Sequence, residues 1–409
     1  MHILYVTQIV PYPPHGGVLQ RGYNLLRELG WHHRVHLLAF RHPDELPAGE
    51  AVEASKRELG KFCAEVEYFD LWPKRSAAHK LLAFGAAALY PKPFSVLAHR
   101  NARLAERVQA LCRQQDAPNL VHLDTIALAP YAALCGDIPT ALGHHNVESQ
   151  LMRRRGEHEQ GTLQKLYVRQ QADRLERYES DTCGQFDVNV VVSDADAVTL
   201  SRIRPGIRTA VVPNGVDCDY FTPRGEPETP TVIFTGGMNM FANRDAVEWF
   251  LEAAWPSIRQ RVPQVRFVAI GQRPSQGILD AAASDASIVV PGHVPDVRTW
   301  VAPAAVYVVP MRVGGGTRLK VLDAMAQGKA IVSTTLGAEG IQGEDGRHFV
   351  LADTGSDFAD RVVDLLQDDA RRRRLGAEAR ERVEHRYAWP VIGRYLADAY
   401  SAAIETHSR

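Results

Sequence analysis

Short runs of β-forming residues alternate with longer stretches of helical periodicity along this chain, and the alternation stops once and starts again. The break is a stretch rich in Pro, Gly and Glu, at 222–230, with the composition of a linker. Strands that alternate with helices predict a parallel sheet with crossover helices. We therefore expect an α/β protein built from two similar halves.

The strands expected in the first half are 3–7, 35–39, 65–69, 120–123, 140–142 and 188–192, with a short one at 211–213. Those expected in the second half are 231–235, 265–270, 288–290, 306–309, 330–333 and 348–350. Helical periodicity marks 18–29, 160–183 and 321–326; Pro390 interrupts the C-terminal helical region, and 387–408 is expected to form a further helix. Open α/β sheets bind ligands beyond the carboxyl ends of their strands, so chemistry is expected there, in a cleft between two domains.

Composition and charge exclude several classes of protein. The 47 basic and 48 acidic side chains leave no net field, which argues against a nucleic-acid partner. Five scattered cysteines without CxxC spacing indicate reduced thiols in a cytoplasmic protein and argue against a metal site. No signal peptide and no apolar run long enough to span a membrane are evident. No GxGxxG follows the first strand of either half, which argues against an NAD enzyme.

A glycine-rich loop in the second half carries the clearest chemical signal. The strand expected at 306–309 ends at Pro310, and a triple glycine and two cations precede a helix. Glycine lets backbone N–H groups approach a ligand, and a helix N-terminus adds partial positive charge, so the pattern predicts a diphosphate site. The alternative is a flexible surface loop with solvated cations. The residues of this loop are Gly314, Gly315, Gly316, Thr317, Arg318 and Lys320.

Four motifs together resemble a known family. They are Gly16-Gly17 after the first strand, Pro-Asn-Gly-Val-Asp at 213–217, Phe-Thr-Gly-Gly at 234–237, and the block Gly-Gly-Gly-Thr-Arg-Leu-Lys at 314–320. In order and spacing, over nearly the whole chain, the sequence resembles the retaining family 4 of GT-B glycosyltransferases. The opening residues and His-His-Asn-Val-Glu-Ser at 144–149 also resemble a subgroup of sugar transferases found with bacterial exopolysaccharide and exosortase systems.

The resemblance implies a GT-B fold, with two Rossmann-like parallel-sheet domains facing a cleft. The implied parts are an acceptor-binding domain over 1–212, a linker over 213–230, a donor-binding domain over 231–386, and a C-terminal helix over 387–409 that packs back on the N-terminal domain. It also implies transfer of a hexose-type sugar from a nucleoside diphosphate, usually UDP, to a hydroxyl of a glycan, a lipid-linked sugar or a small molecule. Retention without a metal, a cofactor or a protein nucleophile is implied as well.

The resemblance assigns roles to individual residues. Arg318 and Lys320 would stabilise the departing diphosphate. Asp323 would accept from the ribose, with a solvated helix carboxylate as the alternative. Plain turns are the alternatives for the glycine pairs and for Val294, which would lie in the base-contacting loop. The implied donor-binding residues are Gly16, Gly17, Gly236, Gly237, Arg244, Val294, Gly314, Gly315, Gly316, Thr317, Arg318, Lys320 and Asp323.

A polar segment after the strand at 140–142 is expected on the acceptor side. His144, His145 and Asn146 would bind the acceptor, and His145 or Glu148 would orient or help deprotonate the attacking hydroxyl. Metal ligation is an alternative, but three ligands in one short loop rarely close a site alone. Structural or helix-capping histidines are the other alternative.

One departure from the family leaves other functions open. Relatives carry a second carboxylate eight positions before the one matched by Asp323, and Gly315 stands there instead. The donor sugar is therefore not fixed by the resemblance. A nucleotide-sugar 2-epimerase of the same fold and a non-catalytic nucleotide-sugar-binding protein remain as alternatives.

A basic and apolar stretch at 74–107 contains seven Lys or Arg and one acid, Glu106. Such a stretch suits an anionic membrane surface, and would give a cytoplasmic enzyme peripheral contact with the inner face of the membrane. The alternative is a pair of core helices with a solvated basic face.

Overall fold

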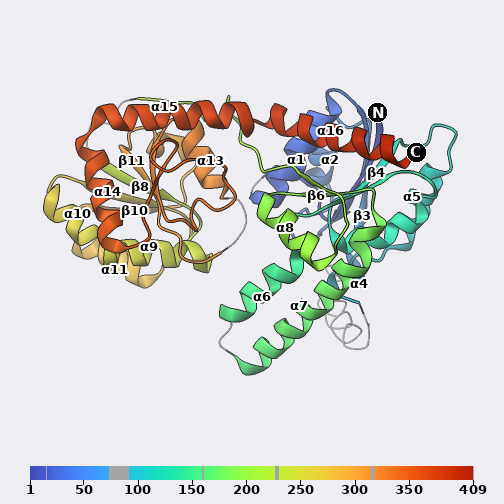
Figure 1. Ribbon diagram of the computed structural model, residues 1–409, viewed down its shortest axis with the longest axis horizontal. Helices are drawn as coiled ribbons and strands as arrows, with labels where there is room; N and C mark the ends of the chain where they lie inside the picture. Colours follow the sequence, from blue (N-terminus) through green and yellow to red (C-terminus); the bar gives the residue numbers. More distant parts are fainter. Residues whose placement is uncertain (15, 73–91, 159–160, 226–229, 315–317, 409) are drawn as a thin grey trace. The chain divides into compact units, whose positions relative to one another are not determined.

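The computed structural model describes residues 1–14, 16–72, 92–158, 161–225, 230–314 and 318–408. The chain divides into two compact units, of which unit 1 is Met1–Pro213 with Ile392–Arg409, and unit 2 is Asn214–Val391. Both chain ends lie in unit 1 (Figure 1). Each unit is described by itself.

Unit 1 is built on a sheet of seven parallel strands in the order β3-β2-β1-β4-β5-β6-β7. The interior strand β1 is mostly apolar and is buried at every residue after His2, as expected for a strand covered by helices on both faces. The strands are β1 (His2–Thr7), β2 (Arg34–Arg41), β3 (Glu65–Asp70), β4 (Leu120–Leu123), β5 (Thr140–Gly143), β6 (Val188–Val191) and β7 (Thr209–Val211).

Helices connect these strands and cover the sheet. Side-chain caps fix two helix starts: Asn101 accepts from the Leu104 amide, and Ser193 accepts from the Asp196 amide. Helices α6 and α7 pack against each other as an antiparallel pair (Figure 1). The helices are α1 (Gly17–Gly30), α2 (Glu50–Leu59), α4 (Phe94–Ala98), α5 (Ala102–Cys112), η2 (Ile126–Leu134), α6 (Glu148–His158), α7 (Thr162–Thr182), η3 (Cys183–Gln185) and α8 (Asp194–Ile203).

Unit 2 is built on a sheet of six parallel strands in the order β10-β9-β8-β11-β12-β13. Its core includes an aromatic cluster in which the ring centroids of Phe250 and Phe267 lie 4.7 Å apart. The strands are β8 (Thr231–Thr235), β9 (Arg266–Ile270), β10 (Ile288–Gly292), β11 (Val306–Val309), β12 (Ala330–Ser333) and β13 (Val350–Leu351). The helices are α9 (Phe241–Ala253), α10 (Trp255–Arg261), α11 (Gln276–Ser284), α12 (Arg298–Val301), α13 (Leu319–Ala326), α14 (Gly355–Gln367) and α15 (Asp369–Arg386).

The last helix, α16 (Trp389–His407), begins in unit 2 and continues in unit 1. At its start, the Val216 amide donates to the Tyr387 carbonyl at 2.8 Å, which fixes the chain before the helix. Further along, a Cβ added at Gly393 would lie 2.5 Å from the Glu28 Cβ of α1, so the two helices meet at van der Waals distance. The hydroxyl of Tyr400 reaches the buried His122 of β4 at 2.9 Å.

The expected α/β architecture with two Rossmann-like parallel sheets is confirmed. Two strand positions are wrong by one or two residues. The strand expected at 211–213 is β7, which ends at Val211, because the next two carbonyls, of Val212 and Pro213, accept from Arg21. The strand expected at 348–350 is β13, which begins only at Val350. His348 lies outside it because this residue belongs to a turn in which its Nδ1 accepts from the Glu344 amide.

Other expectations meet the structure only in part. Residues 74–91 of the proposed membrane stretch lie outside the described residues, and in the rest of it α4 buries Val96 and Ala98, and α5 buries Leu104. Among the described residues, no helix has both the length and the apolar character needed to cross a bilayer. All five cysteines are free thiols.

The contact between α16 and α1 predicts opposite effects at two helical glycines. Gly393→Ala should lower the free energy of unfolding, measured by urea denaturation, by roughly 1–3 kcal/mol, because its Cβ would overlap Glu28. Gly277→Ala in α11, where a Cβ would meet nothing within 4 Å, should raise stability by about 0.4–1 kcal/mol. Equal effects of the two substitutions would contradict the docking of α16 on α1.

Candidate functional site

Lys320 lies at the centre of a polar site at the carboxyl ends of the strands of unit 2. It stands in the first turn of α13, and its Nζ donates to Asn243 Oδ1 of α9 at 2.7 Å. The same ammonium lies 4.2 Å from the ring centroid of Phe234, at the end of β8. Asn243 in turn donates from Nδ2 to the Gly237 carbonyl at 2.9 Å. One lysine, one amide and the loop after β8 thus form a single cluster.

The backbone of Gly236 lies so close to this lysine that a side chain at this position would displace the ammonium group. A Cβ at Gly236 would lie 2.5 Å from Lys320 Nζ, and its φ of 156° is unfavourable for other residues. Glycine is also required at position 271, after β9, because a Cβ there would lie 1.9 Å from the backbone carbonyl oxygen of Gly236. The predicted donor residues Gly236, Gly237 and Lys320 are therefore brought together.

Arg318 joins the cluster from the glycine-rich loop. It is the residue before α13, and a Cβ at Gly314 would lie 2.8 Å from its Nη2, so its guanidinium lies against the Gly314 backbone. Gly315, Gly316 and Thr317 lie outside the described residues. Arg318 and Lys320 therefore lie beside the backbones of Gly314 and Gly236, an arrangement that suits a ligand with several negative oxygens.

The charges of this site are poorly balanced. Burial and, to a smaller extent, the nearby Arg318 lower the pKa of Lys320 to about 7, while Asp323 opposes both. Burial also raises the pKa of Asp323 to about 7, against the effect of Lys320. An anion bound beside Arg318 and Lys320 would supply the missing negative charge, and so favour the protonated lysine.

The other predicted donor residues of unit 2 lie near the same sheet edge. Arg244 stands in the first turn of α9, with its guanidinium 5.6 Å from the Phe241 ring centroid. Val294 follows β10, half-buried against the core. Within the described part of the chain, no hydrogen bond or ion pair joins either residue to Lys320. Asn243 and Gly271 were missed from the sequence, although Gly271 directly follows an expected strand.

In unit 1, Asp124 and His145 form a buried pair at the carboxyl ends of β4 and β5. His145 Nε2 lies 3.1 Å from Asp124 Oδ2, and the two side chains are 8% and 5% exposed. Tyr5 donates its hydroxyl to the other carboxylate oxygen at 3.1 Å, and Thr7 Oγ1 lies 3.1 Å from Oδ2. Asp124 was also missed from the sequence, although it directly follows the strand expected at 120–123.

The carboxylate of Asp124 is held in its ionised form. Burial alone would raise its pKa, but the imidazoles of His145 and His122 outweigh burial and keep the pKa well below its usual range. His122 stacks on Tyr5 with ring centroids 4.3 Å apart, and burial lowers its own pKa. The Asp124 carboxylate is therefore a buried anion held among the rings of Tyr5, His122 and His145.

The neighbouring His144 has a different environment. Its Nε2 hydrogen-bonds Asn189 Oδ1 at 3.1 Å, and Asn189 donates to the Cys183 carbonyl at 3.0 Å. Burial lowers the pKa of His144 to about 4, so the ring is neutral near pH 7. This residue fixes β5 to β6 through Asn189, whereas His145 points to Asp124.

The rest of the acceptor segment forms the start of α6. Glu148 is its first residue, and burial raises the pKa of this carboxyl group. Beside it, the fully buried Glu179 of α7 accepts from the Ser149 amide at 3.2 Å, and burial raises the pKa of Glu179 to about 7. Asn146 is half-buried between His145 and this helix. Gly16 and Gly17, at the start of α1, complete the predicted positions in unit 1.

Candidate metal ligands occur elsewhere in the described residues. His36, Glu65 and Glu67 lie close enough to share an ion, but Arg107 already pairs with Glu67 at 2.7 Å and with Glu65 at 3.5 Å. His42, Asp44 and Glu45 form a second such group at the surface.

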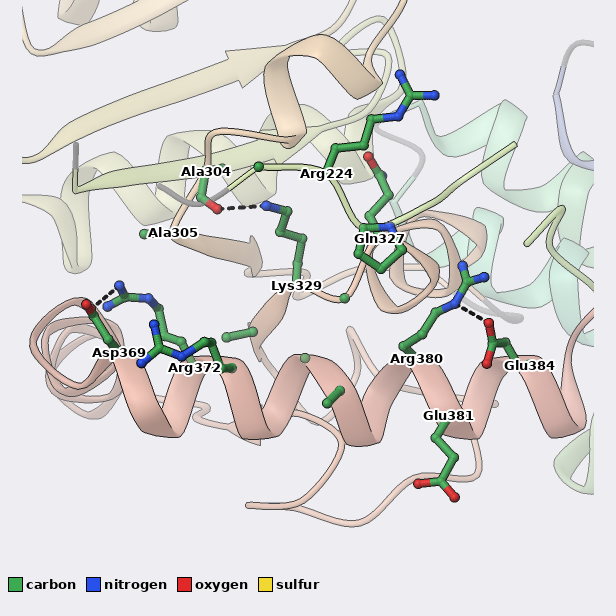
Figure 2. A pocket seen from close by; sticks show the side chains of 17 residues that line it. Arg224, Ala304, Ala305, Gln327, Lys329, Asp369, Arg372, Arg380, Glu381 and Glu384 are labelled. Carbon is green, nitrogen blue, oxygen red and sulfur yellow. Dashed lines mark hydrogen bonds and ion pairs between the residues drawn. The ribbon is translucent and has the colours of Figure 1, made fainter. Parts of the chain in front are cut away.

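A cavity of about 440 Å³ lies at the amino ends of β11 and β12 (Figure 2), and Lys320 does not line it. Two cations that line it, Lys329 and Arg380, are already hydrogen-bonded to groups of the protein. Lys329 donates to the carbonyls of Ala302 and Ala304, and Arg380 pairs with Glu384 and donates to the Phe221 carbonyl. This cavity is therefore a place where cations join α12, α15 and the segment before β8.

Two family models match the sequence. The model described as Glycosyltransferase Family 4 matches residues 15–220, which is half of the chain, and the model described as Glycosyl transferases group 1 matches residues 229–368. Together they span most of both units.

Curated relatives include two bacterial proteins. A phosphatidyl-myo-inositol mannosyltransferase of Mycolicibacterium smegmatis is 31% identical over 199 residues, which are 46% of this chain and 50% of that protein. An uncharacterized 44.6 kDa protein from the cps region of Klebsiella pneumoniae is 23% identical over 94% of this chain and 96% of its own length. The chain thus spans about half the length of the mannosyltransferases that it matches.

Solved structures share the fold at low sequence identity. Sucrose-phosphate synthase from Thermosynechococcus elongatus has a TM-score of 0.69 at 16% identity, over 98% of each chain. Anabaena HepE, solved in complex with UDP and glucose, has a TM-score of 0.63 at 15% identity, over 98% of this chain and 99% of its own. Two parallel sheets, matching structures of this architecture and a family model over half of the sequence lead to one conclusion: the chain has the GT-B fold and belongs to glycosyltransferase family 4.

Proposed function

We propose that this protein transfers a sugar from a nucleoside diphosphate sugar, with UDP as the nucleoside diphosphate, to a hydroxyl acceptor. The observation that carries the proposal is the cluster of Arg318 and Lys320 against the backbones of Gly314 and Gly236. Two cations and close-approaching glycines suit a leaving group that gains negative charge as its bond to the sugar breaks. The donor would bind to unit 2 and the acceptor to unit 1.

The proposed reaction proceeds with retention and needs no metal. The bond between the sugar C1 and the phosphate oxygen breaks, and its electron pair leaves on the diphosphate. The acceptor oxygen forms the new bond on the same face, and its proton passes to the leaving phosphate oxygen. Arg318 and Lys320 would stabilise the diphosphate, which is the charge stabilisation that a metal supplies in other transferases.

The proposed substrates follow from the relatives. HepE was solved with UDP and glucose, whereas one mannosyltransferase of Mycobacterium tuberculosis is described as GDP-mannose-dependent. UDP is therefore the first donor to test and GDP the second. The acceptor would be a lipid-linked sugar or a glycan of exopolysaccharide synthesis, in keeping with relatives named for phosphatidylinositol and for a cps region.

A non-catalytic nucleotide-sugar-binding protein is the second candidate, because Gly315 replaces a carboxylate of the wider family. Such a protein would bind the nucleotide without consuming a donor sugar. Incubation with a UDP-sugar and candidate acceptors separates the two functions. A transferase releases UDP, whereas a binding protein leaves the UDP-sugar intact.

Removing either cation should weaken donor binding. In calorimetry with UDP and EDTA, Arg318→Ala and Lys320→Ala should each lose roughly 1.5–3 kcal/mol of binding free energy, as for hydrogen bonds to charged groups. Arg347→Ala is the matched control, because this guanidinium pairs with Glu344 and Glu378 at the surface of unit 2. Unchanged affinity in both site variants would remove the proposed diphosphate site.

Donor binding should also take up protons at pH 8. Lys320 has a pKa of about 7 without ligand, and a bound diphosphate raises it. Since UDP is already fully ionised at pH 8, the protein should gain up to about one proton per molecule. Calorimetry in buffers of different ionisation enthalpy measures this uptake. It should fall in Lys320→Gln, and proton release in the wild type would contradict the assignment.

His145 should matter for transfer and not for donor binding. His145→Ala is expected to leave UDP affinity unchanged while lowering kcat, because this residue lies in unit 1 with Asp124. Titration with UDP and initial rates with a saturating acceptor measure the two effects. A collapse of UDP affinity would show that His145 belongs to the donor site.

A further inference from the structure

We propose that Arg273 is a further donor-binding residue, whose guanidinium contacts the diphosphate of the nucleotide sugar. The inference rests on the proposed function for the identity of the donor. It concerns the segment 271–275, which follows β9 and which we call the β9 loop, and it uses contacts within unit 2 alone.

The β9 loop lies between the loops that follow β8 and β10, because β9 lies between these two strands in the sheet. The Gly271 amide donates to the Gly292 carbonyl at 3.0 Å, which ties the β9 loop to the end of β10. On the other side, the Gln272 carbonyl accepts from the Met238 amide, also at 3.0 Å. The β9 loop is therefore fixed at the carboxyl edge of the sheet, against the loop that contains Gly236.

Arg273 has a backbone conformation that is unfavourable for a residue with a side chain. Its φ is 53°, and in the described part of the chain it is the only residue other than glycine with a positive φ. The left-handed region brings Cβ close to the following carbonyl oxygen, so glycine usually occupies it. Pro274 comes next, and a residue before proline favours an extended backbone. Residues held in such conformations cluster at ligand-binding sites.

Contacts on both sides hold Arg273 in this conformation. Before it, the Gln272 carbonyl is bonded to the loop after β8. After it, Ser275 Oγ accepts from the Ile278 amide at 3.4 Å, which caps α11, and donates to Glu248 of α9 at 2.6 Å. These contacts do not use the Arg273 side chain. The fold thus fixes the backbone from which the guanidinium extends, and leaves the guanidinium to other partners.

The guanidinium of Arg273 makes no hydrogen bond, ion pair or ring contact with any described residue, and its side chain is exposed. Two other arginines in loops at this edge are already paired with carboxylates. Arg312 pairs with Asp245 at 2.6 Å, and Arg298 pairs with Asp296 at 2.7 Å. Arg273 is therefore a cation at the sheet edge whose N–H donors are available to a ligand.

Phosphate oxygens are the ligand chemistry that this position favours. The loop after β8 lies between the β9 loop and the loop after β11, which leads to Lys320. The backbone of Gly236 contacts both neighbours, since its own Cβ would meet Lys320 Nζ and a Cβ at Gly271 would meet its carbonyl oxygen. A diphosphate bound against Gly236 would have Lys320 on one side and Arg273 on the other. A guanidinium binds two phosphate oxygens through parallel N–H bonds, which suits this role.

Four variants of the full chain separate charge, shape and backbone strain. Arg273→Gln removes the charge and keeps the backbone demand, Arg273→Lys keeps the charge, and Arg273→Gly relieves the backbone. Arg266→Gln is the matched control. Arg266 lies at the amino end of the same strand, and its exposed side chain also makes no contact of these kinds with a described residue.

Calorimetry with UDP and EDTA measures the contact with the diphosphate. Arg273→Gln and Arg273→Gly should each raise the Kd for UDP roughly tenfold, as for hydrogen bonds to charged groups. Arg273→Lys should raise it by less than about threefold, because lysine binds phosphate as a point charge but does not reproduce the planar stacking surface of arginine. Arg266→Gln should leave the Kd unchanged. An equal loss in Arg273→Lys and Arg273→Gln would indicate stacking on the base and overturn the phosphate contact.

Thermal unfolding without ligand measures the strain at this position. Arg273→Gly should unfold at the same midpoint as the wild type or at a higher one, because glycine adopts this φ without steric cost. Arg273→Gln should leave the midpoint unchanged, since it keeps the same backbone demand. A lower midpoint in Arg273→Gln would show that the arginine side chain stabilises the fold, and would overturn its assignment to a ligand.

The same titrations separate this inference from the proposed function. Unchanged UDP affinity in Arg273→Gln, together with weakened binding in Arg318→Ala, overturns the role of Arg273 and leaves the proposed donor site in place. If the wild type binds neither UDP nor GDP, the proposed function fails and the inference fails with it.

Discussion

The constraint on which both sites depend is that every strand pairing in the two sheets is parallel. Parallel strands point their carboxyl ends to one edge, so the loops after separate strands meet there even when they are far apart in sequence. In unit 2 this brings the residue after β9 against the loop after β8, as Gly271 and Gly236 show. In unit 1 it brings Asp124 after β4 to His145 after β5.

The two edges carry different chemistry. The edge of unit 2 is made of backbone and two cations, with Lys320 weakly charged near neutral pH because burial lowers its pKa. The edge of unit 1 is built around an anion, Asp124, enclosed by rings and hydroxyls. One edge suits a ligand that is already negative, and the other suits a neutral ligand that must be held in one orientation.

The sequence predicted the sheets well, because buried parallel strands are short apolar runs with breaks at both ends. It placed Lys320 and Gly236 in one site from their motifs, and the structure brings them together. It missed Asp124 and Asn243, because a single polar residue after a strand has no signature until its partner is known. It also could not distinguish His144 from His145, since the backbone conformation after β5 decides which ring meets Asn189 and which meets Asp124.

The place of α16 has a consequence for synthesis of the chain. Unit 1 consists of Met1–Pro213 and Ile392–Arg409, so translation delivers its last helix only after the whole of unit 2. Until then His122 lacks the hydroxyl of Tyr400, and the α1 surface around Glu28 lacks its helical cover. Unit 2, in contrast, is continuous from Asn214 to Val391. Synthesis therefore delivers the whole sequence of unit 2 before the segment that completes unit 1, which reverses the usual order in which domains complete.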